Sequence, residues 1–155
     1  MRTFSRRKML LALSIVATAS YRIRGEQRPK VDVYKDPTCG CCANWVTHMK
    51  MRGFDATATD VRDMAALKAK YHVPSQLQSC HTALVNGYVI EGHVPASDVQ
   101  RLLDQRPKVV GLAVPGMPIG SPGMEGPNGK PYDVLTFDAA GKTTVFSTQQ
   151  PSSRA

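Results

Sequence analysis

The feature that most constrains this chain is a group of three cysteines within four residues, Cys39-Gly40-Cys41-Cys42. Alternating apolar and polar residues predict a strand over 31–34, Asp36-Pro37-Thr38 predicts a turn between this strand and the group, and the residues after the group predict a helix. The first peptide N–H groups of a helix lack partners inside the helix and favour a nearby negative charge. A chain that folds this way presents its cysteines as acidic thiols, which are good nucleophiles and soft metal ligands.

The cysteines begin the first helix of a predicted α/β fold. That helix carries Trp45, Val46 and Met49 on one face. It ends at Gly53, because glycine favours the left-handed backbone found after helix ends. A second strand is predicted over 54–59, so strand, helix and strand form a βαβ unit with parallel pairing.

A helix, a hairpin and another helix are predicted next. Asp60 is the expected N-cap of the second helix. Two apolar runs around Asn86-Gly87 predict a hairpin over 83–90, because this pair favours the type I′ turn. Ser97 and Gln100 match a capping box at the start of the third helix. The order β-α-β-α-β-β-α, with cysteines at the start of the first helix, is typical of a thioredoxin-like arrangement.

Residues 111–131 interrupt this pattern. Six glycines and five prolines among them are incompatible with helices and strand ladders, and a connection this long is usually functional or disordered. Two similar triplets, Pro115-Gly116-Met117 and Pro122-Gly123-Met124, each place a methionine on this loop. An added C-terminal hairpin is predicted after it, with strands over 133–137 and 143–147.

Residues 1–19 are predicted to be an export signal. Basic residues precede an apolar run over 9–17, and Ala17-Thr18-Ala19 offers a cleavage site. Residues 5–10 also resemble a twin-arginine signal, although Met9 stands where that signal usually has Phe. Export would place the cysteines in the oxidising periplasm, where thiols persist only if paired, metal-bound or actively reduced. We therefore expect a signal peptide (1–19), a basic spacer (20–30), one domain (31–148) and a flexible tail (149–155).

The basic charge of the chain belongs to this leader and its spacer. The formal net charge is +8, yet from residue 31 onward 12 basic residues nearly balance 11 acidic ones. Nucleic acid is therefore not expected among the partners. No apolar run reaches the roughly 18 residues of a membrane span, so none is expected after the signal is removed.

Further candidate ligands lie outside the cysteine group. In a thioredoxin-like arrangement, the loop before the hairpin packs against the Cys-x-x-Cys turn, so Cys80 can complete a four-sulfur cluster. His81 offers an imidazole, but neighbours on a strand point to opposite faces, and a surface position for His81 stays open. Met117 and Met124 supply thioethers, which with thiolates suit Cu(I). The alternative for both methionines is that they pin the loop to the domain.

The remaining histidines and methionines carry weaker signals. His93 is expected to hydrogen-bond or cap a turn, with ligation of a metal as the alternative. His48 and His72 are expected on the surface. Met49 and Met64 are predicted core residues.

Four motifs resemble those of the CopG-type copper-resistance proteins, also described as the domain of unknown function 411 family. In chain order they are Tyr34-Lys35-Asp36-Pro37-Thr38-Cys39-Gly40-Cys41-Cys42, Ser79-Cys80-His81-Thr82-Ala83, Gly87-Tyr88-Val89-Ile90-Glu91-Gly92-His93-Val94-Pro95 and Val114-Pro115-Gly116-Met117-Pro118-Ile119-Gly120-Ser121-Pro122-Gly123-Met124-Glu125. The resemblance implies a periplasmic, thioredoxin-like protein linked to copper tolerance. It also implies that Cys39, Cys41, Cys42 and Cys80 are the main copper ligands.

Three functions follow from these patterns. The first is a protein of the periplasm that holds copper as Cu(I), singly or as a thiolate-bridged cluster, with other copper-handling proteins as partners. The second is a thiol–disulfide or copper oxidoreductase, in which Cys39 attacks and Cys42 resolves. The third is a secreted domain stapled by two disulfides, for which sequence allows three pairings. Zinc also suits four thiolates, and copper is preferred for the methionines and the resemblance.

Overall fold

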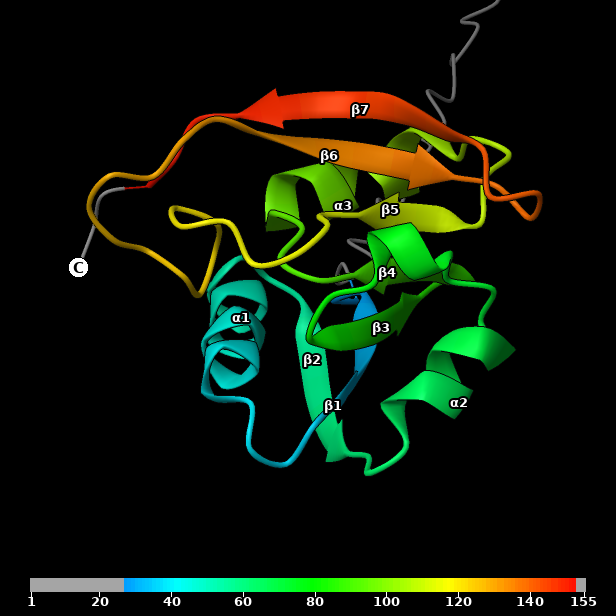
Figure 1. Cartoon of the computed structure of the whole chain (residues 1–155), viewed down its shortest axis with the longest axis horizontal. Helices are drawn as coiled ribbons and strands as arrows, with labels where there is room; N and C mark the ends of the chain where they lie inside the picture. The colour runs from blue at the N-terminus through cyan, green and yellow to red at the C-terminus, as the bar shows by residue number, and fades with distance from the viewer. Residues whose placement is uncertain (1–26, 153–155) are drawn as a thin grey trace, which may run out of the picture.

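The computed structural model describes residues 27–152, in which seven strands form one mixed sheet with three helices and a short 3-10 helix (Figure 1). The predicted signal peptide and most of the spacer lie outside the described residues. No helix within 27–152 is long and apolar enough to cross a membrane. In chain order the elements are β1 (Lys30–Lys35), α1 (Gly40–Met51), β2 (Asp55–Asp60), α2 (Met64–Lys70), η1 (Ser75–Leu77), β3 (His81–Val85), β4 (Tyr88–Glu91), α3 (Ala96–Gln105), β5 (Gly111–Ala113), β6 (Tyr132–Phe137) and β7 (Thr143–Gln149).

The first four strands follow the predicted order. β1 pairs with β2 in parallel and with β3 in antiparallel orientation, and β3 and β4 form the hairpin. The turn residues Asn86 and Gly87 have φ of 45° and 85°, the positive values that a type I′ turn requires. The prediction of an α/β fold that contains a βαβ unit is therefore confirmed.

The predicted apolar face of α1 holds this helix on the sheet. Trp45 and Met49 are fully buried, and they share one core cluster with Val31 and Val33 of β1. Burying a side chain of this size stabilises a fold by about 1.5–3 kcal/mol. Gly53 follows the helix with φ of 91°, as predicted. The packing sets the direction of α1 and therefore the position of the cysteines at its start.

The prediction that residues 111–131 contain no strand is wrong at their beginning. β5 pairs in parallel with β4 and in antiparallel orientation with β6, so the sheet runs without a break into the C-terminal hairpin. Gly111 permits this pairing, because a side chain there would collide with the backbone of Val89. The hairpin of β6 and β7 lies where the sequence predicts it.

The start of α2 differs from the prediction. Asp60 is the last residue of β2, and Asp63 caps the helix by accepting the amide N–H of Ala66 at 2.9 Å. Met64, predicted in the core, is only half-buried, whereas Lys68 is the buried residue of this helix. The apolar residues of α2 form only a weak periodic pattern. Lys68, rather than Met64, is therefore the residue of α2 that is buried.

The start of α3 also differs from the prediction. No side chain of Ser97 or Gln100 caps it; the amide N–H of Ala96 donates to Nε2 of His48 at 3.1 Å instead. His48, predicted on the surface, is therefore half-buried and joins α1 to α3. Because its partner lies far along the chain, the local sequence could not indicate this cap.

We call residues 114–124 the strap; Figure 1 draws it in yellow beside α1. The backbone N–H of Gly120 donates to the Met124 carbonyl at 2.8 Å, and the Gly120 carbonyl accepts from Ser152 at 2.9 Å. At Gly123, where φ is 91°, a Cβ would lie 2.9 Å from both the Cys41 carbonyl oxygen and the Trp45 amide nitrogen. The strap thus runs directly over the first turns of α1.

We expect Gly123→Ala to lower the free energy of unfolding by about 1–3 kcal/mol, because alanine disfavours positive φ and its Cβ would press on the backbone of α1. Equilibrium unfolding in guanidinium chloride measures the loss. Gly126→Ala in the same loop is the matched control, since its Cβ would meet only the Ile119 side chain at 3.4 Å. A change of about 0.5 kcal/mol or less is expected there. Equal losses in the two variants would contradict the close contact at Gly123.

Candidate metal centre

Two of the four cysteines form a disulfide at the start of α1. Cys39, the residue directly before the helix, is bonded to Cys42. The carbonyl of Asp36 accepts the amide N–H of Cys39 at 3.1 Å, a turn that leads the chain from β1 into α1. Cys39 is half-buried and Cys42 is fully buried, so only Cys39 of the pair is partly exposed.

Cys41 lies at the centre of the sulfur atoms. Its Sγ is 3.5 Å from Cys39 Sγ, 3.9 Å from Cys80 Sγ and 3.7 Å from Met117 Sδ. Cys41 and Cys80 are free thiols, and all four cysteine sulfurs lie within 4.8 Å of one another. The fold therefore brings Cys80 to the cysteine group, although 39 residues separate it from Cys41.

Cys80 also faces two histidines. Its Sγ is 3.5 Å from Nδ1 of His81 and 3.3 Å from Nε2 of His93. The surface position that stayed open for His81 is wrong, because His81 is fully buried. Alternation along a strand does not apply here, since β3 begins at His81 and Cys80 lies in the bend before it. His93 does hydrogen-bond a turn residue, with Nδ1 3.1 Å from Oγ of Ser121 in the strap.

The indole of Trp45 packs against His81, and His81 in turn packs against His93. The ring of Trp45 lies 4.5 Å from that of His81, which lies 5.5 Å from that of His93. Burial lowers the pKa of His93 to about 4 and that of His81 well below its ordinary value. Both rings are therefore neutral at neutral pH. A neutral imidazole keeps a nitrogen lone pair, which metal ligation needs.

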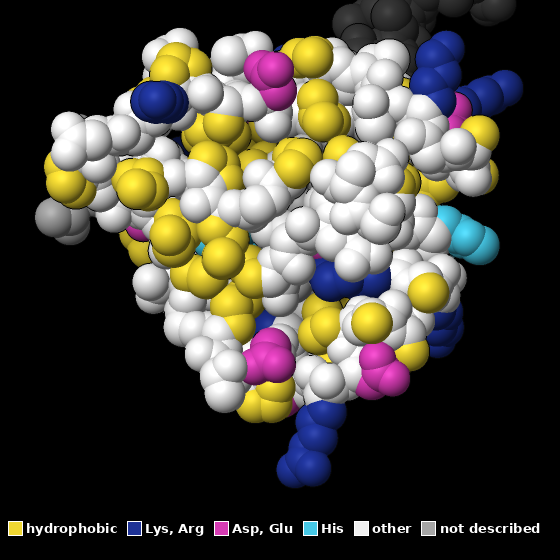
Figure 2. Space-filling model, in the orientation of Figure 1, with side chains coloured by type: hydrophobic (Ala, Val, Ile, Leu, Met, Phe, Trp, Pro, Cys, Tyr) yellow, Lys and Arg dark blue, Asp and Glu magenta, His cyan; other side chains and the backbone are white. Residues whose placement is uncertain are grey.

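The candidate methionines differ in position. Met117 is 49% exposed, and its thioether contacts Cys41. The Met124 backbone closes the turn of the strap by donating to the Ser121 carbonyl at 2.8 Å. Among the contacts described for residues 27–152, none joins the Met124 sulfur to a cysteine. Met49, predicted in the core, is fully buried there. Figure 2 shows hydrophobic side chains gathered on the face where the strap lies beside α1.

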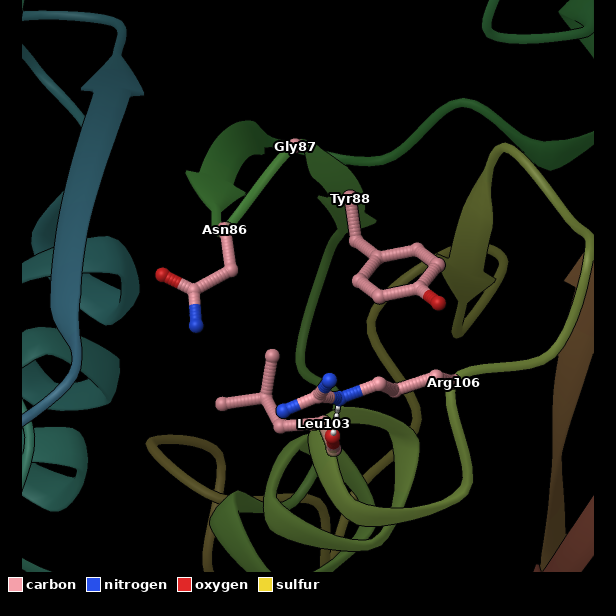
Figure 3. A pocket seen from close by; sticks show the side chains of 5 residues that line it. All are labelled: Asn86, Gly87, Tyr88, Leu103 and Arg106. Atoms are coloured by element: carbon pink, nitrogen blue, oxygen red, sulfur yellow. Dashed lines mark hydrogen bonds between the residues drawn. The ribbon is translucent and has the colours of Figure 1, made fainter.

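A separate cavity lies far from the sulfur atoms. Figure 3 shows its lining of Asn86, Gly87, Tyr88, Leu103 and Arg106, around a volume of about 380 Å³. These residues belong to the turn end of the β3–β4 hairpin and the end of α3, whereas Cys80 precedes the open end of that hairpin. The lining of this cavity contains none of the candidate metal ligands.

The donor set suits a soft metal ion. Four cysteine sulfurs, one thioether and two neutral imidazoles converge from α1, the β3 bend, the loop after β4 and the strap. Thiolates and thioethers favour Cu(I), and thiolates with imidazoles also suit zinc. With the disulfide intact, only Cys41 and Cys80 can ligate as thiolates, so the full sulfur set requires its reduction. Sequence reasoning gave His93 only as an alternative ligand, because nothing local indicates that its loop meets Cys80.

Comparisons with known proteins identify a family and two similar solved structures. A family model described as "Protein of unknown function, DUF411" matches residues 77–124, which include Cys80, both buried histidines and the strap. A solved structure named "Copper resistance protein copG", form 1, is 42% identical, with a TM-score of 0.74, and the match covers 78% of this chain and 97% of that one. Form 2 is 41% identical, with a TM-score of 0.75, and the match covers 79% and 98%. No curated protein matches the chain.

We expect the copper-free Cys80 thiol to alkylate slowly at pH 8, because burial, and then the neighbouring Cys41, raise its pKa to about 11. Its alkylation rate should rise about tenfold per pH unit towards that value, since the thiolate is the reactive form. Peptide mass spectrometry after iodoacetamide treatment measures the rate at Cys80 alone.

The same shift makes stability pH-dependent. The folded chain keeps the Cys80 proton above the ordinary thiol pKa of about 8.5, at which an unfolded chain loses it. The free energy of unfolding should therefore decrease between about pH 8.5 and the folded-state pKa of about 11. Cys80→Ser should flatten this slope, and an unchanged slope in that variant would contradict the assignment.

Proposed function

Because this chain belongs to the family of the copper resistance protein CopG, we propose that it binds copper as Cu(I) on its clustered sulfur atoms and so contributes to copper resistance. The convergence of four cysteine sulfurs within 4.8 Å carries the proposal. Cu(I) is the expected form, since a site of thiolates and a thioether matches a soft cation. Zinc is the competing ion, and the family favours copper.

The proposed ligands are the four cysteines, with Met117 at the exposed side and the histidines at the buried side. His93 supports Cys80 better than His81 does, because its Nε2 is the nearer nitrogen at 3.3 Å. Met124 was a candidate ligand because of its sequence triplet. We assign it instead to the turn of the strap, which its backbone N–H closes. Thiolates bridge metal ions readily, so four sulfurs this close suit a cluster of several copper ions as well as a single ion.

The redox state of Cys39 and Cys42 would set how much copper the site holds. The disulfide form offers two free thiols, and reduction by two electrons releases the other two. We therefore propose that the oxidised chain holds less copper than the reduced chain. A periplasmic location fits this behaviour, because that compartment favours disulfides, and the export signal inferred from residues 1–19 is the basis for it. Other periplasmic copper-handling proteins are the natural exchange partners.

A thiol–disulfide or copper oxidoreductase is the second candidate function. The half-exposed Cys39 and buried Cys42 have the positions expected of an attacking and a resolving cysteine. The strand order β2-β1-β3-β4, with the disulfide at the start of α1, supports a thioredoxin-like topology for this part of the fold. A purely structural disulfide is less favoured, because free Cys41 lies 3.5 Å from Cys39 and can exchange with it.

We expect the reduced chain, loaded with Cu(I) without oxygen, to retain copper with all four thiols protected from alkylation. Copper per chain, measured by elemental analysis against free thiols, tests the proposal. Cys80→Ser should lower the copper content or affinity and leave the fold unchanged. Met117→Leu should lower the copper affinity, because it removes the thioether beside Cys41. Met51→Leu is its matched control, since Met51 is 79% exposed at the other end of α1. Absence of retained copper in the unaltered chain would refute the function.

The second candidate has its own measurement. If the chain is an oxidoreductase, the reduced, copper-free form should reduce a small disulfide or Cu(II), and Cys39→Ser should abolish this while Cys41→Ser should not. Oxidation of the chain itself can be followed by the return of the Cys39–Cys42 disulfide in peptide maps. Turnover that survives loss of Cys39 would exclude the assigned roles.

A further inference from the structure

A buried ion pair, Lys68 with Glu91, contacts the loop that carries Cys80. Glu91, at the end of β4, is fully buried, and Lys68 is the one buried residue of α2. Nζ of Lys68 donates to Oε1 of Glu91 at 2.5 Å and to Oγ1 of Thr82 at 3.0 Å. The Thr82 hydroxyl in turn donates to Oε2 of Glu91 at 2.6 Å. These three side chains satisfy one another away from water.

The carboxylate has one more donor, and it comes from the loop that carries the cysteine. The backbone N–H of Ser79 donates to Oε1 of Glu91 at 2.6 Å. Ser79 is the residue directly before Cys80, and its hydroxyl donates to the Gly116 carbonyl of the strap. Gly92 leaves room for this loop, because a Cβ there would lie 2.7 Å from the Ser79 side chain. The loop before Cys80 is therefore held from two sides.

Stability alone does not account for such a pair. Taking two charges out of water is costly, and replacing a buried ion pair by apolar side chains of similar volume is often neutral or stabilising. An apolar pair, however, has no oxygen that could accept the Ser79 amide. That acceptor is a direct contact between the pair and the loop that carries Cys80.

We propose that Glu91 is a positioning residue for Cys80. Its carboxylate is ion-paired with Lys68 and accepts a hydrogen bond from the Ser79 amide. This hydrogen bond fixes the loop so that the Cys80 sulfur lies beside Cys41 and His93. The effect of Glu91 on copper binding rests on the proposed function, whereas its effect on the position of Cys80 does not. Loss of the acceptor should loosen Cys80 without unfolding the domain.

The test compares two double variants of the copper-free chain with its disulfide intact. Lys68→Met with Glu91→Leu removes both charges and the acceptor. Lys68→Met with Glu91→Gln removes the charges and keeps an oxygen that can accept the Ser79 amide. Alkylation of Cys80 by iodoacetamide should be roughly tenfold or more faster in the Leu variant, and within about threefold of the original chain in the Gln variant. Cooperative unfolding of both variants shows that the fold persists.

Two outcomes would overturn the proposal. One is an unchanged Cys80 rate in a folded Leu variant; the other is equal acceleration in the Gln and Leu variants, which would make charge, not the acceptor, the cause. If the Leu variant does not fold, Ser79→Pro removes the donor and leaves the ion pair, with Ser79→Ala as control. The Pro variant should alkylate faster than the Ala variant, and equal rates would again overturn it.

Copper loading separates this proposal from the proposed function. The Leu variant, once reduced, should hold less copper than the Gln variant. If even the original chain retains no copper, the copper function fails while the alkylation result still decides the role of Glu91.

Discussion

The burial of a single indole holds the parts of the site together. Trp45 is fully buried, and its Nε1–H donates to the Val94 carbonyl at 2.9 Å, which ties α1 to the loop after His93. Its ring packs on His81, and its backbone lies directly under Gly123 of the strap. The three segments that approach the cysteines therefore meet around one side chain. Trp45 therefore adds to the packing of α1 on the sheet a direct link between the helix that starts with the cysteines and the segments around Cys80.

The candidate metal ligands lie partly in the interior and partly at the surface. The histidines are buried and stay neutral at physiological pH, because burial lowers the pKa of each. Met117 and Cys39 are partly exposed. An ion could therefore enter and leave on the thioether side, while the imidazole side fixes the geometry.

Much of the fold could be predicted from the sequence, and the failures have a common cause. The hairpin at Asn86-Gly87 and the apolar face of α1 are local patterns, and both are confirmed. β5 was missed because its three residues stand in a glycine-rich loop and become a strand only between two others. The cap of α3 was misplaced for the same kind of reason, since His48 reaches its partner through space. The start of α2 is the exception: its cap, Asp63, is local, and Asp60 was unsuitable because it still belongs to β2.

The candidate site also has parts that the sequence predicted and parts that it could not predict. The cysteine group is a local motif. The expected packing of the loop before the hairpin predicted Cys80, and the Pro-Gly-Met triplet predicted Met117; both lie at the group. The buried position of His81 could not be predicted, because the alternation rule assumes that Cys80 is already in the strand. The buried pair of Lys68 and Glu91 gave no signal at all, since each residue alone is typical of a solvated surface.

The strap has a consequence for affinity that its contacts alone do not express. It leaves the sheet at β5 and the chain rejoins the sheet at β6, so both ends of the loop are tethered. A tethered donor acts at a high effective concentration, because it returns to its place faster than a competing molecule can arrive. If Met117 binds the ion as proposed, the anchoring of this loop in the sheet would let its thioether detach and return to the same ion repeatedly.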